Sequence, residues 1–252
     1  MKIITRPLAF FKRTLVSTLK RLFRQLGYEI VSDSASYMTM DGGIGRIKSR
    51  GIAINSVIDV GASNGRWSEL CMKYFPDCNY HLFEAQKEYR NPLEGLKKKN
   101  SKIDYSLCVA SNVKGNIYFD DHIVGGGIAN DKKLNDNFKK LDASTIDYEV
   151  SKRNLKGPFL IKLDTHGFEV PIIEGAEKTL KETNILVIEC YNFKLNPTCL
   201  KFQEMISYME NKGFLVMDIV DLALRTKDSF LWQMDIFFAR SDMKEFVDNS
   251  YE

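Results

Sequence analysis

The chain of 252 residues is 44% hydrophobic and carries a formal net charge of +3 at pH 7, which suits one full hydrophobic core and requires no second catalytic domain. Its five cysteines are odd in number and lack Cys-x-x-Cys spacing, which argues against a disulfide framework and against a zinc site. No apolar run approaches the ~18 to 20 residues that span a bilayer. We therefore expect one domain with an added N-terminal segment, in the reducing cytoplasm.

Residues 1–28 differ from the rest of the chain in charge. They contain seven Lys and Arg residues and no acidic residue, and their apolar residues recur at steps of three and four. This spacing predicts a basic amphipathic helix. Such a helix can lie on an anionic membrane, dock onto a partner, or pack its apolar face on the catalytic domain with its charges in water. The charges interrupt the apolar stretch that a signal peptide needs.

The N-terminal segment also bears on domain boundaries and partners. We assign residues 1–54 to a basic amphipathic helical extension and residues 55–252 to the catalytic domain. Because the extension contributes much of the net charge, that charge is poor evidence for binding nucleic acid. The expected location is the cytoplasm, with peripheral attachment to the inner face of the membrane as a further possibility.

A short helix is predicted over residues 38–53, and residues 57–70 follow as a buried strand, a glycine turn and the start of a helix. Gly61 and Gly65 let the backbone pass close to a ligand where a Cβ atom would collide. An acidic residue inside the strand, and alanine in place of the second glycine of a dinucleotide fingerprint, suit a cofactor without phosphate, such as S-adenosylmethionine with its ammonium group. The predicted cofactor contacts here are Asp59, Gly61, Ala62, Ser63, Asn64, Gly65 and Trp67.

The second strand, 80–83, is followed by Glu84, about 20 residues after the glycine turn. A Rossmann-like fold places there the carboxylate that accepts hydrogen bonds from a ribose diol, and an ionised glutamate has the two oxygens that this requires. The alternative is an α/β domain with a glycine turn and a solvated glutamate. A third strand, 105–109, ends beside the predicted adenine pocket. The further cofactor contacts are Glu84, Ala85, Cys108, Val109 and Ala110.

Residues 120–130 contain three consecutive glycines before the fourth strand. At the ligand-binding side of a sheet such a segment serves as a lid that excludes water, or it is an ordinary turn in a β excursion made by residues 116–119. Because both interpretations stay open, His122 is a weaker catalytic candidate than His166. Further along, Asp147 is expected to cap the helix that follows it.

The fourth and fifth strands, 159–163 and 185–189, are apolar runs with polar residues at their carboxyl ends, where open α/β sheets bind ligands. Asp164 follows the fourth strand and is predicted to contact cofactor or substrate, or to cap a helix that begins near Gly167. Glu189 ends the fifth strand. The aromatic side chains in residues 191–193 either stack on a sugar or anchor the loop in the core.

Helices are predicted between these strands at 67–75, 87–99, 170–181 and 198–212. Strands that alternate with helices predict a parallel sheet covered on both faces. The last two apolar runs, 214–220 and 231–239, leave no room for a crossover helix and must pair antiparallel. We therefore expect the α/β fold of class I methyltransferases, with a Rossmann-like, mostly parallel seven-stranded sheet, a terminal antiparallel hairpin and an N-terminal helical extension.

Several of these motifs resemble the FkbM-type S-adenosylmethionine-dependent methyltransferase family. The resemblance runs from about residue 56 to residue 239 and includes the order of the motifs as well as their residues. The motifs that carry it are residues 57–68, 83–84, 144–147, 159–176 and 187–189. It implies transfer of a methyl group to an oxygen, commonly a hydroxyl on a sugar of a glycan or on a secondary metabolite. The chain departs from the family pattern at Ser63, where the family has asparagine, and at His166, where many members carry Glu or Gln.

Methyl transfer is an in-line displacement, so the enzyme must align the lone pair of the acceptor with the methyl group. A hydroxyl also needs a base that shares its proton. Asp164 and His166 are the leading candidates for that base, since histidine titrates near neutrality, and Glu189 is a third candidate. The alternative for His166 is a loop histidine that only hydrogen-bonds the backbone.

A divalent metal ion is the other means of acidifying a hydroxyl. Asp164, Glu189 and Asp147 could converge as oxygen ligands for Mg²⁺. Scattered carboxylates are not a metal signature, however, and the sequence leaves the metal open.

Other classes of function stay open as well. Adenine-N6 methyltransferases of nucleic acids show an Asn-Pro-Pro-Tyr-like tetrad after the fourth strand, and residues 164–167 are not one, so we expect no nucleic acid partner. The basic N-terminal segment motivates a non-catalytic scaffold, although the intact glycine turn and Glu84 argue for a working pocket. The expected partner is a sugar or glycan acceptor, with a non-sugar acceptor such as a polyketide as the alternative. The sequence indicates no oligomeric state.

Overall fold

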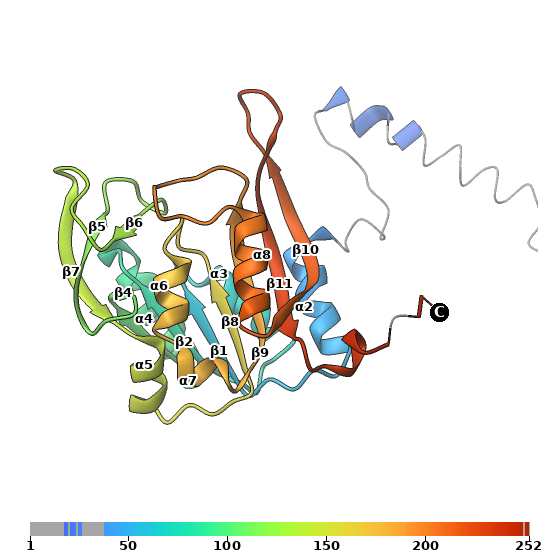
Figure 1. Ribbon diagram of the computed structural model, residues 1–252, viewed down its shortest axis with the longest axis horizontal. Coiled ribbons are helices and arrows are strands. Elements are labelled where there is room, and N and C mark those ends of the chain that lie inside the picture. The colour runs from blue at the N-terminus through green and yellow to red at the C-terminus, as the bar shows by residue number, and fades with distance from the viewer. Residues whose placement is uncertain (1–17, 20, 24, 27–37, 249, 252) are drawn as a thin grey trace, which may run out of the picture.

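The computed structural model describes residues 18, 19, 21–23, 25, 26, 38–248, 250 and 251 (Figure 1). The predicted helix over residues 1–28 lies largely outside these residues. The apolar side chains described there, Leu19, Leu22, Phe23 and Leu26, are exposed. Within the described part of the chain, every helix is too short or too polar to cross a bilayer.

A seven-stranded sheet forms the centre of the domain, in the order β10-β11-β9-β8-β1-β2-β3. Five strands run parallel, while β11 pairs antiparallel with both β9 and β10. The mostly parallel sheet and its terminal antiparallel hairpin are therefore confirmed. The strands are β1 (Ser56–Val60), β2 (Asn79–Glu84), β3 (Ile103–Leu107), β8 (Phe159–Leu163), β9 (Thr183–Tyr191), β10 (Phe214–Leu224) and β11 (Leu231–Arg240).

Helices cover both faces of this sheet and divide the core into two clusters of buried side chains. Side chains of α6 and α8 pack in one cluster, and those of α2, α3 and α4 pack in the other. Every residue of β1 and β8 is buried, as expected for central strands that helices cover on both sides. The helical elements are α2 (Met40–Ser49), α3 (Arg66–Met72), η2 (Lys87–Tyr89), α4 (Arg90–Lys99), α5 (Ile146–Lys152), α6 (Glu169–Glu174), α7 (Glu177–Leu180), α8 (Phe202–Asn211) and η3 (Lys244–Phe246).

Two predicted helices differ from the observed ones. The helix expected over residues 170–181 is divided into α6 and α7 at Gly175, which packs directly on the backbone of Ser111: a Cβ atom at Gly175 would lie 2.0 Å from the Ser111 carbonyl oxygen. The helix expected from residue 198 begins only at Phe202, because the side chain of Asn196 accepts hydrogen bonds from the backbone of Thr198 and Cys199 and holds a turn there.

A second, four-stranded sheet stands beside the central one, in the order β4-β7-β5-β6. Its strands are β4 (Val109–Ala110), β5 (Gly115–Asp120), β6 (Ile128–Asn130) and β7 (Phe138–Ser144). The sequence predicts only the β excursion at residues 116–119, and it assigns residue 109 to the third strand of the main sheet. In Figure 1 this sheet lies at the left of the molecule.

A buried polar network lies where β2 and β3 meet α5. His81 is fully buried on β2, with its Nε2 atom 3.2 Å from the Ser106 hydroxyl. That hydroxyl also contacts Glu149 and Arg153. Burial, reinforced by the positive charge of Arg153, lowers the pKa of His81 to about 3. The folded protein therefore keeps this imidazole neutral where an ordinary histidine would take up a proton.

This neutral histidine predicts a loss of stability in acid. Between pH 6.5, the ordinary pKa, and about 3, the unfolded chain binds a proton that the folded protein excludes, so the free energy of unfolding falls as the pH falls. From pH 7 to pH 5 the contribution of His81 to the free energy of unfolding drops by about 2 kcal/mol. Urea unfolding at both pH values measures it. In His81→Gln the fall in the free energy of unfolding between pH 7 and pH 5 should be smaller by this amount. In the control His122→Gln, at an exposed histidine, it should equal that of the wild type. An equal fall in wild type and His81→Gln would show that His81 is not the group responsible.

Candidate active site

A cavity of about 310 Å³ opens at the carboxyl ends of β1, β2, β8 and β9. This volume falls in the range of roughly 300 to 1,000 Å³ that is typical of small-molecule sites. Phe119, Gly125, Gly127 and Ala129, from the second sheet and its loop, form the opposite wall. The cavity therefore lies where open α/β sheets bind ligands, closed on one side by a segment that the main sheet does not supply.

The glycine turn after β1 is required by packing within the protein. Gly61 has a φ of 79°, and a Cβ atom there would lie 2.0 Å from the backbone oxygen of Asp164. Gly65 has a φ of 81°, and its Cβ atom would lie 2.1 Å from Leu96 on α4. Packing against the chain after β8 and against helix α4 is therefore a reason for both glycines that the sequence interpretation did not include.

Glu84 holds the glycine turn and the end of β2 together. One carboxylate oxygen accepts a hydrogen bond from the backbone of Ser63 at 2.6 Å, and the other accepts one from the backbone of Gln86 at 2.7 Å. Burial raises the pKa of Glu84, while these backbone donors act against the shift. Each oxygen of an ionised carboxylate keeps a lone pair for a further donor, and Glu84 lines the cavity. The geometry therefore fits a pair of ribose hydroxyls.

The predicted cofactor contacts divide into two groups. Those that line the cavity are Gly61, Ser63, Glu84, Ala85, Cys108, Val109, Ala110 and Asp164. Those that do not line it are Asp59, Ala62, Asn64, Gly65 and Trp67. Asp59 is fully buried beneath the cavity and accepts a hydrogen bond from Ser68 at 2.7 Å. Trp67 lies against Lys162, whose ammonium is 5.7 Å from the centre of the indole.

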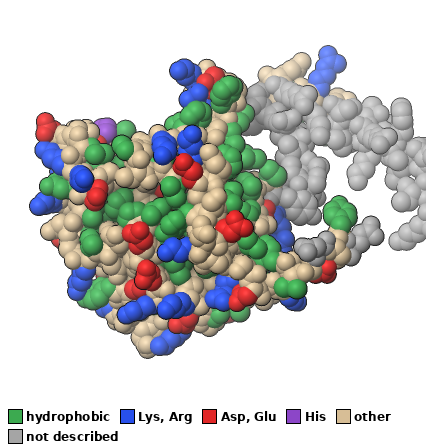
Figure 2. Space-filling model, viewed as in Figure 1, with side chains coloured by type: hydrophobic (Ala, Val, Ile, Leu, Met, Phe, Trp, Pro, Cys, Tyr) green, Lys and Arg blue, Asp and Glu red, His purple; other side chains and the backbone are tan. Residues whose placement is uncertain are grey.

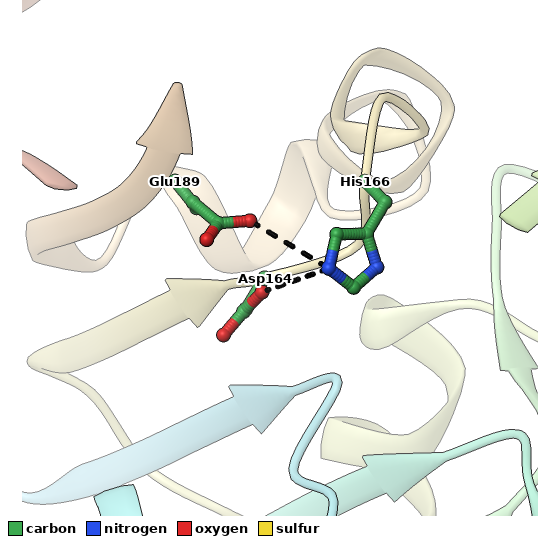
Figure 3. A group of neighbouring side chains, drawn as sticks. All are labelled: Asp164, His166 and Glu189. Atoms are coloured by element: carbon green, nitrogen blue, oxygen red, sulfur yellow. Dashed lines mark ion pairs between the residues drawn. The ribbon is translucent and has the colours of Figure 1, made fainter. Parts of the chain in front are cut away.

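The three predicted catalytic residues come together at the cavity (Figure 3). The Nε2 atom of His166 lies 3.9 Å from Oδ1 of Asp164 and 3.9 Å from Oε2 of Glu189. The Nδ1 atom on the other side of the ring is 3.3 Å from the backbone oxygen of Gly127. His166 thus has the backbone contact that was its alternative interpretation, and it also faces both carboxyl groups. Its φ of 52° turns the chain sharply after β8.

Lys162 sets the charge of this cluster. Its ammonium lies 2.7 Å from Oδ2 of Asp164 and is buried. Burial opposes ionisation of Asp164, but the charge and the hydrogen bond of Lys162 outweigh it and lower the pKa of that carboxyl. Burial and the neighbouring charge of Asp164 raise the pKa of Glu189 to about 9. At neutral pH in the ligand-free protein Asp164 is therefore ionised and Glu189 carries a proton, which makes Asp164 the better base.

The sequence interpretation missed several residues that hold this cluster. The hydroxyl of Tyr191 and the side-chain amide of Gln233 both donate to Glu189, the latter at 2.7 Å. Asp235, opposite Glu189 on β11, is half-buried, and loss of solvent around the carboxyl raises its pKa to about 7. Lys162 could have been found from the sequence, because it is the one charged residue within the otherwise apolar strand β8. Nothing in the sequence around Gln233 and Asp235 indicates a role at the site, because only strand pairing brings β11 there.

Two predicted roles of acidic residues are wrong. Asp164 caps no helix; the side chain of Glu169 accepts the hydrogen bonds from Gly167 and Thr165 instead. Asp147 does not cap α5, where Thr145 does so.

Asp147 also lies outside the carboxylate cluster. Its oxygens accept hydrogen bonds from the backbone of Lys178 and Thr179 in α7. Asp147 therefore does not converge with Asp164 and Glu189, which was the arrangement that the sequence had left open for a metal ion. His166 takes that place. His122 contacts Asp120 and does not line the cavity. Phe193 stacks on Trp232, with ring centres 5.4 Å apart, so it anchors the loop.

Gln86 fastens the glycine-rich segment to the end of β2. Its side-chain amide donates to the backbone oxygen of Ile123 at 2.9 Å, and its side-chain oxygen accepts from the backbone of Gly125 at 2.8 Å. Gly125 and Gly127 line the cavity. The segment therefore forms one wall of the cavity, and the Gln86 side chain ties that wall to the end of β2.

We expect Gln86→Ala to loosen this wall. Loss of two hydrogen bonds at about 1 kcal/mol each should make backbone amides of residues 121–127 exchange with solvent about 30-fold faster. Hydrogen exchange followed by mass spectrometry measures this. Gln203→Ala, at an exposed position of α8, is the matched control. Unchanged exchange in residues 121–127 would show that other contacts hold the segment.

The fold and the cavity define a Rossmann-like domain with a pocket at the carboxyl ends of its strands, and comparisons with known proteins identify its family. The sequence matches the model of the methyltransferase FkbM domain over residues 59–216. Because this match covers more than half of the chain, the protein belongs to the FkbM methyltransferase family. A search of curated sequences finds no match.

Solved structures of methyltransferases are among the similar folds. One is the N-methyltransferase NodS from Bradyrhizobium japonicum WM9 in complex with S-adenosyl-l-homocysteine, with 10% identity, a TM-score of 0.45 and coverage of 80% of this chain and 86% of that chain. Another is precorrin-6y C5,15-methyltransferase from Geobacter metallireducens GS-15, with 10% identity, a TM-score of 0.43 and coverage of 78% and 86%.

Proposed function

We propose that the protein is an O-methyltransferase that uses S-adenosylmethionine to methylate a hydroxyl of a sugar, a glycan or a glycosylated metabolite. One observation carries the proposal: a single cavity joins a ribose-type carboxylate, Glu84, to the cluster of Asp164, His166 and Glu189. The two ends lie on β2 and β9, three strand spacings apart, or about 14 Å at the usual spacing of ~4.8 Å.

The residues at hand fit the cofactor. Glu84 would hold the ribose diol, and Cys108, Val109 and Ala110 would border the adenine. The end of β8 would then face the sulfonium. When bound, S-adenosylmethionine supplies an electrophilic methyl group and leaves as S-adenosylhomocysteine.

The cluster can prepare the acceptor oxygen. Asp164, ionised beside Lys162, accepts the proton of the hydroxyl while that oxygen supplies the electron pair for the new bond to carbon. Glu189, protonated in the ligand-free protein, donates a hydrogen bond and fixes the direction of approach. His166 borders both carboxyl groups and can relay the proton to solvent.

An acceptor screen tests the proposal. The purified protein is incubated with S-adenosylmethionine and with nucleotide sugars, oligosaccharides and glycosylated polyketides, with and without Mg²⁺, and methyl ethers are located by mass spectrometry. We expect a methyl ether on a sugar hydroxyl, and at least a 100-fold loss of rate in Asp164→Asn. A methyl group found on nitrogen or on an aglycone would overturn the acceptor assignment. Binding of S-adenosylhomocysteine with no transfer to any acceptor would favour the scaffold function.

We also propose that the basic N-terminal segment attaches the protein to the cytoplasmic face of a membrane. In support, its described apolar side chains are exposed, and Leu222, Leu224 and Phe230 on the β10–β11 arm are exposed too. Figure 2 shows apolar and charged side chains side by side on that arm. Sedimentation with vesicles that contain anionic lipid should be lost when residues 1–28 are deleted. Equal sedimentation of both proteins would remove this proposal.

A further inference from the structure

We propose that Asp164, His166 and Glu189 form a site for one divalent cation at the acceptor end of the cavity. One ligand atom from each residue takes part, and these three atoms all lie within 4.8 Å of one another. Two atoms bound to the same ion at about 2.1 Å can be at most about 4.2 Å apart. The two separations of 3.9 Å from Nε2 of His166 lie within this limit, and closing them to the roughly 3.0 Å between neighbouring ligands of an octahedral ion takes a movement of about 1 Å.

Hydrogen bonds to neighbouring residues orient the three side chains so that their ligand atoms face one another. Oδ2 of Asp164 is occupied by Lys162, which leaves Oδ1 facing His166. When Nδ1 of His166 donates to the backbone oxygen of Gly127, the neutral ring presents the unprotonated Nε2 to both carboxyl groups. An imidazole lone pair and one oxygen from each carboxyl group then face one another. Metal ligands are typically oriented by such outer partners, and here these are Lys162, Gly127, Tyr191 and Gln233.

The surrounding charges also favour a cation. The buried ammonium of Lys162 is surrounded by the buried Asp59 and the half-buried Asp164 and Asp235, and Glu189 lies opposite Asp235. One ammonium cannot balance these carboxyl groups in their ionised form, and a divalent ion bound there would supply the missing positive charge. Carboxylate oxygens suit Mg²⁺ and Mn²⁺, while an imidazole ligand shifts the preference toward Mn²⁺ and other transition ions.

The site would leave coordination positions open toward the cavity, which all three residues line. An octahedral ion with three protein ligands has three positions left, and two neighbouring hydroxyls of a sugar can fill two of them. This use of the ion rests on the proposed function and narrows the acceptor to a vicinal diol. Binding of the ion itself does not depend on that function.

Binding of Mn²⁺ to the chelator-treated protein tests the site, with free Mn²⁺ counted by electron paramagnetic resonance. We expect one ion per chain and at least a tenfold loss of affinity in His166→Gln and in Glu189→Gln. Tyr191→Phe, which removes only an outer partner, should lose about tenfold as well. Asp131→Asn, at an exposed carboxylate, is the control. Circular dichroism shows that each variant is folded.

The readouts separate this inference from the proposed function. Titration with S-adenosylhomocysteine in chelator reports on the cofactor pocket alone. Tight nucleoside binding without any Mn²⁺ or Mg²⁺ binding at 1 mM, roughly the free level at which weak sites fill, would overturn the metal site and leave the methyltransferase standing. Mn²⁺ binding that stays unchanged in all three variants would also overturn it, because the ion would then sit elsewhere.

Discussion

Replacing Lys162 by methionine should lower the free energy of unfolding by about 3 to 5 kcal/mol. Lys162 is buried, its ammonium lies 2.7 Å from Asp164, and it faces Asp59 across the β1–β8 pair. Without it, the buried Asp59 and the half-buried Asp164 have no ammonium beside them, and each must either stay ionised without that partner or take up a proton. Urea unfolding at pH 7 measures the loss.

The pH dependence identifies the cause. Lys162 lowers the pKa of Asp164, so its stabilising effect is present above the ordinary value of 3.8 and is lost as the pH falls below it. The difference between wild type and Lys162→Met should therefore shrink in acid. Lys73→Met, at an exposed lysine on α3, should change stability by less than about 0.5 kcal/mol. A loss below about 1 kcal/mol in Lys162→Met would contradict the charge assignment.

Replacing Glu84 by glutamine should weaken the binding of S-adenosylmethionine by about 100-fold. The carboxylate accepts one backbone hydrogen bond at each oxygen, from Ser63 and Gln86, and offers its remaining lone pairs to the cavity. In glutamine one of those oxygens becomes an NH₂ group, which faces a backbone donor and cannot accept from a hydroxyl. The hydrogen bonds from the two ribose hydroxyls to an ionised carboxylate contribute about 3 kcal/mol to binding, and their loss corresponds to this change in affinity.

Calorimetric titration of the folded variant measures the affinity. Glu88→Gln is the matched control, because Glu88 is exposed on the adjacent turn η2. Affinity within threefold of wild type in Glu84→Gln would show that the ribose is held elsewhere.

Local sequence patterns were sufficient to predict the parts of the fold whose contacts form between segments that are close in the sequence. The strand at 57–60, its glycine turn and Glu84 follow one another directly, and the apolar runs after residue 213 are too close to be parallel. The cluster of Asp164, His166 and Glu189 was also predictable. β8 and β9 are parallel neighbours in the sheet, so polar residues at their carboxyl ends must meet.

Contacts between distant segments could not be predicted in this way. Strand β7 carries the exposed residues Lys139, Lys140 and Asp142, so its sequence resembles a loop, and only its pairing with β5 identifies it as a strand. Asp147 sits at the start of α5, as a cap would, yet its hydrogen bonds go to α7. The break at Gly175 depends on the backbone of Ser111.

The structure of the protein with bound S-adenosylhomocysteine tests the central claim most directly. We expect the ribose hydroxyls to hydrogen-bond to Glu84 and the sulfur to face the cluster of Asp164, His166 and Glu189. A nucleoside bound outside this cavity, or an empty cavity at saturating ligand, would contradict it.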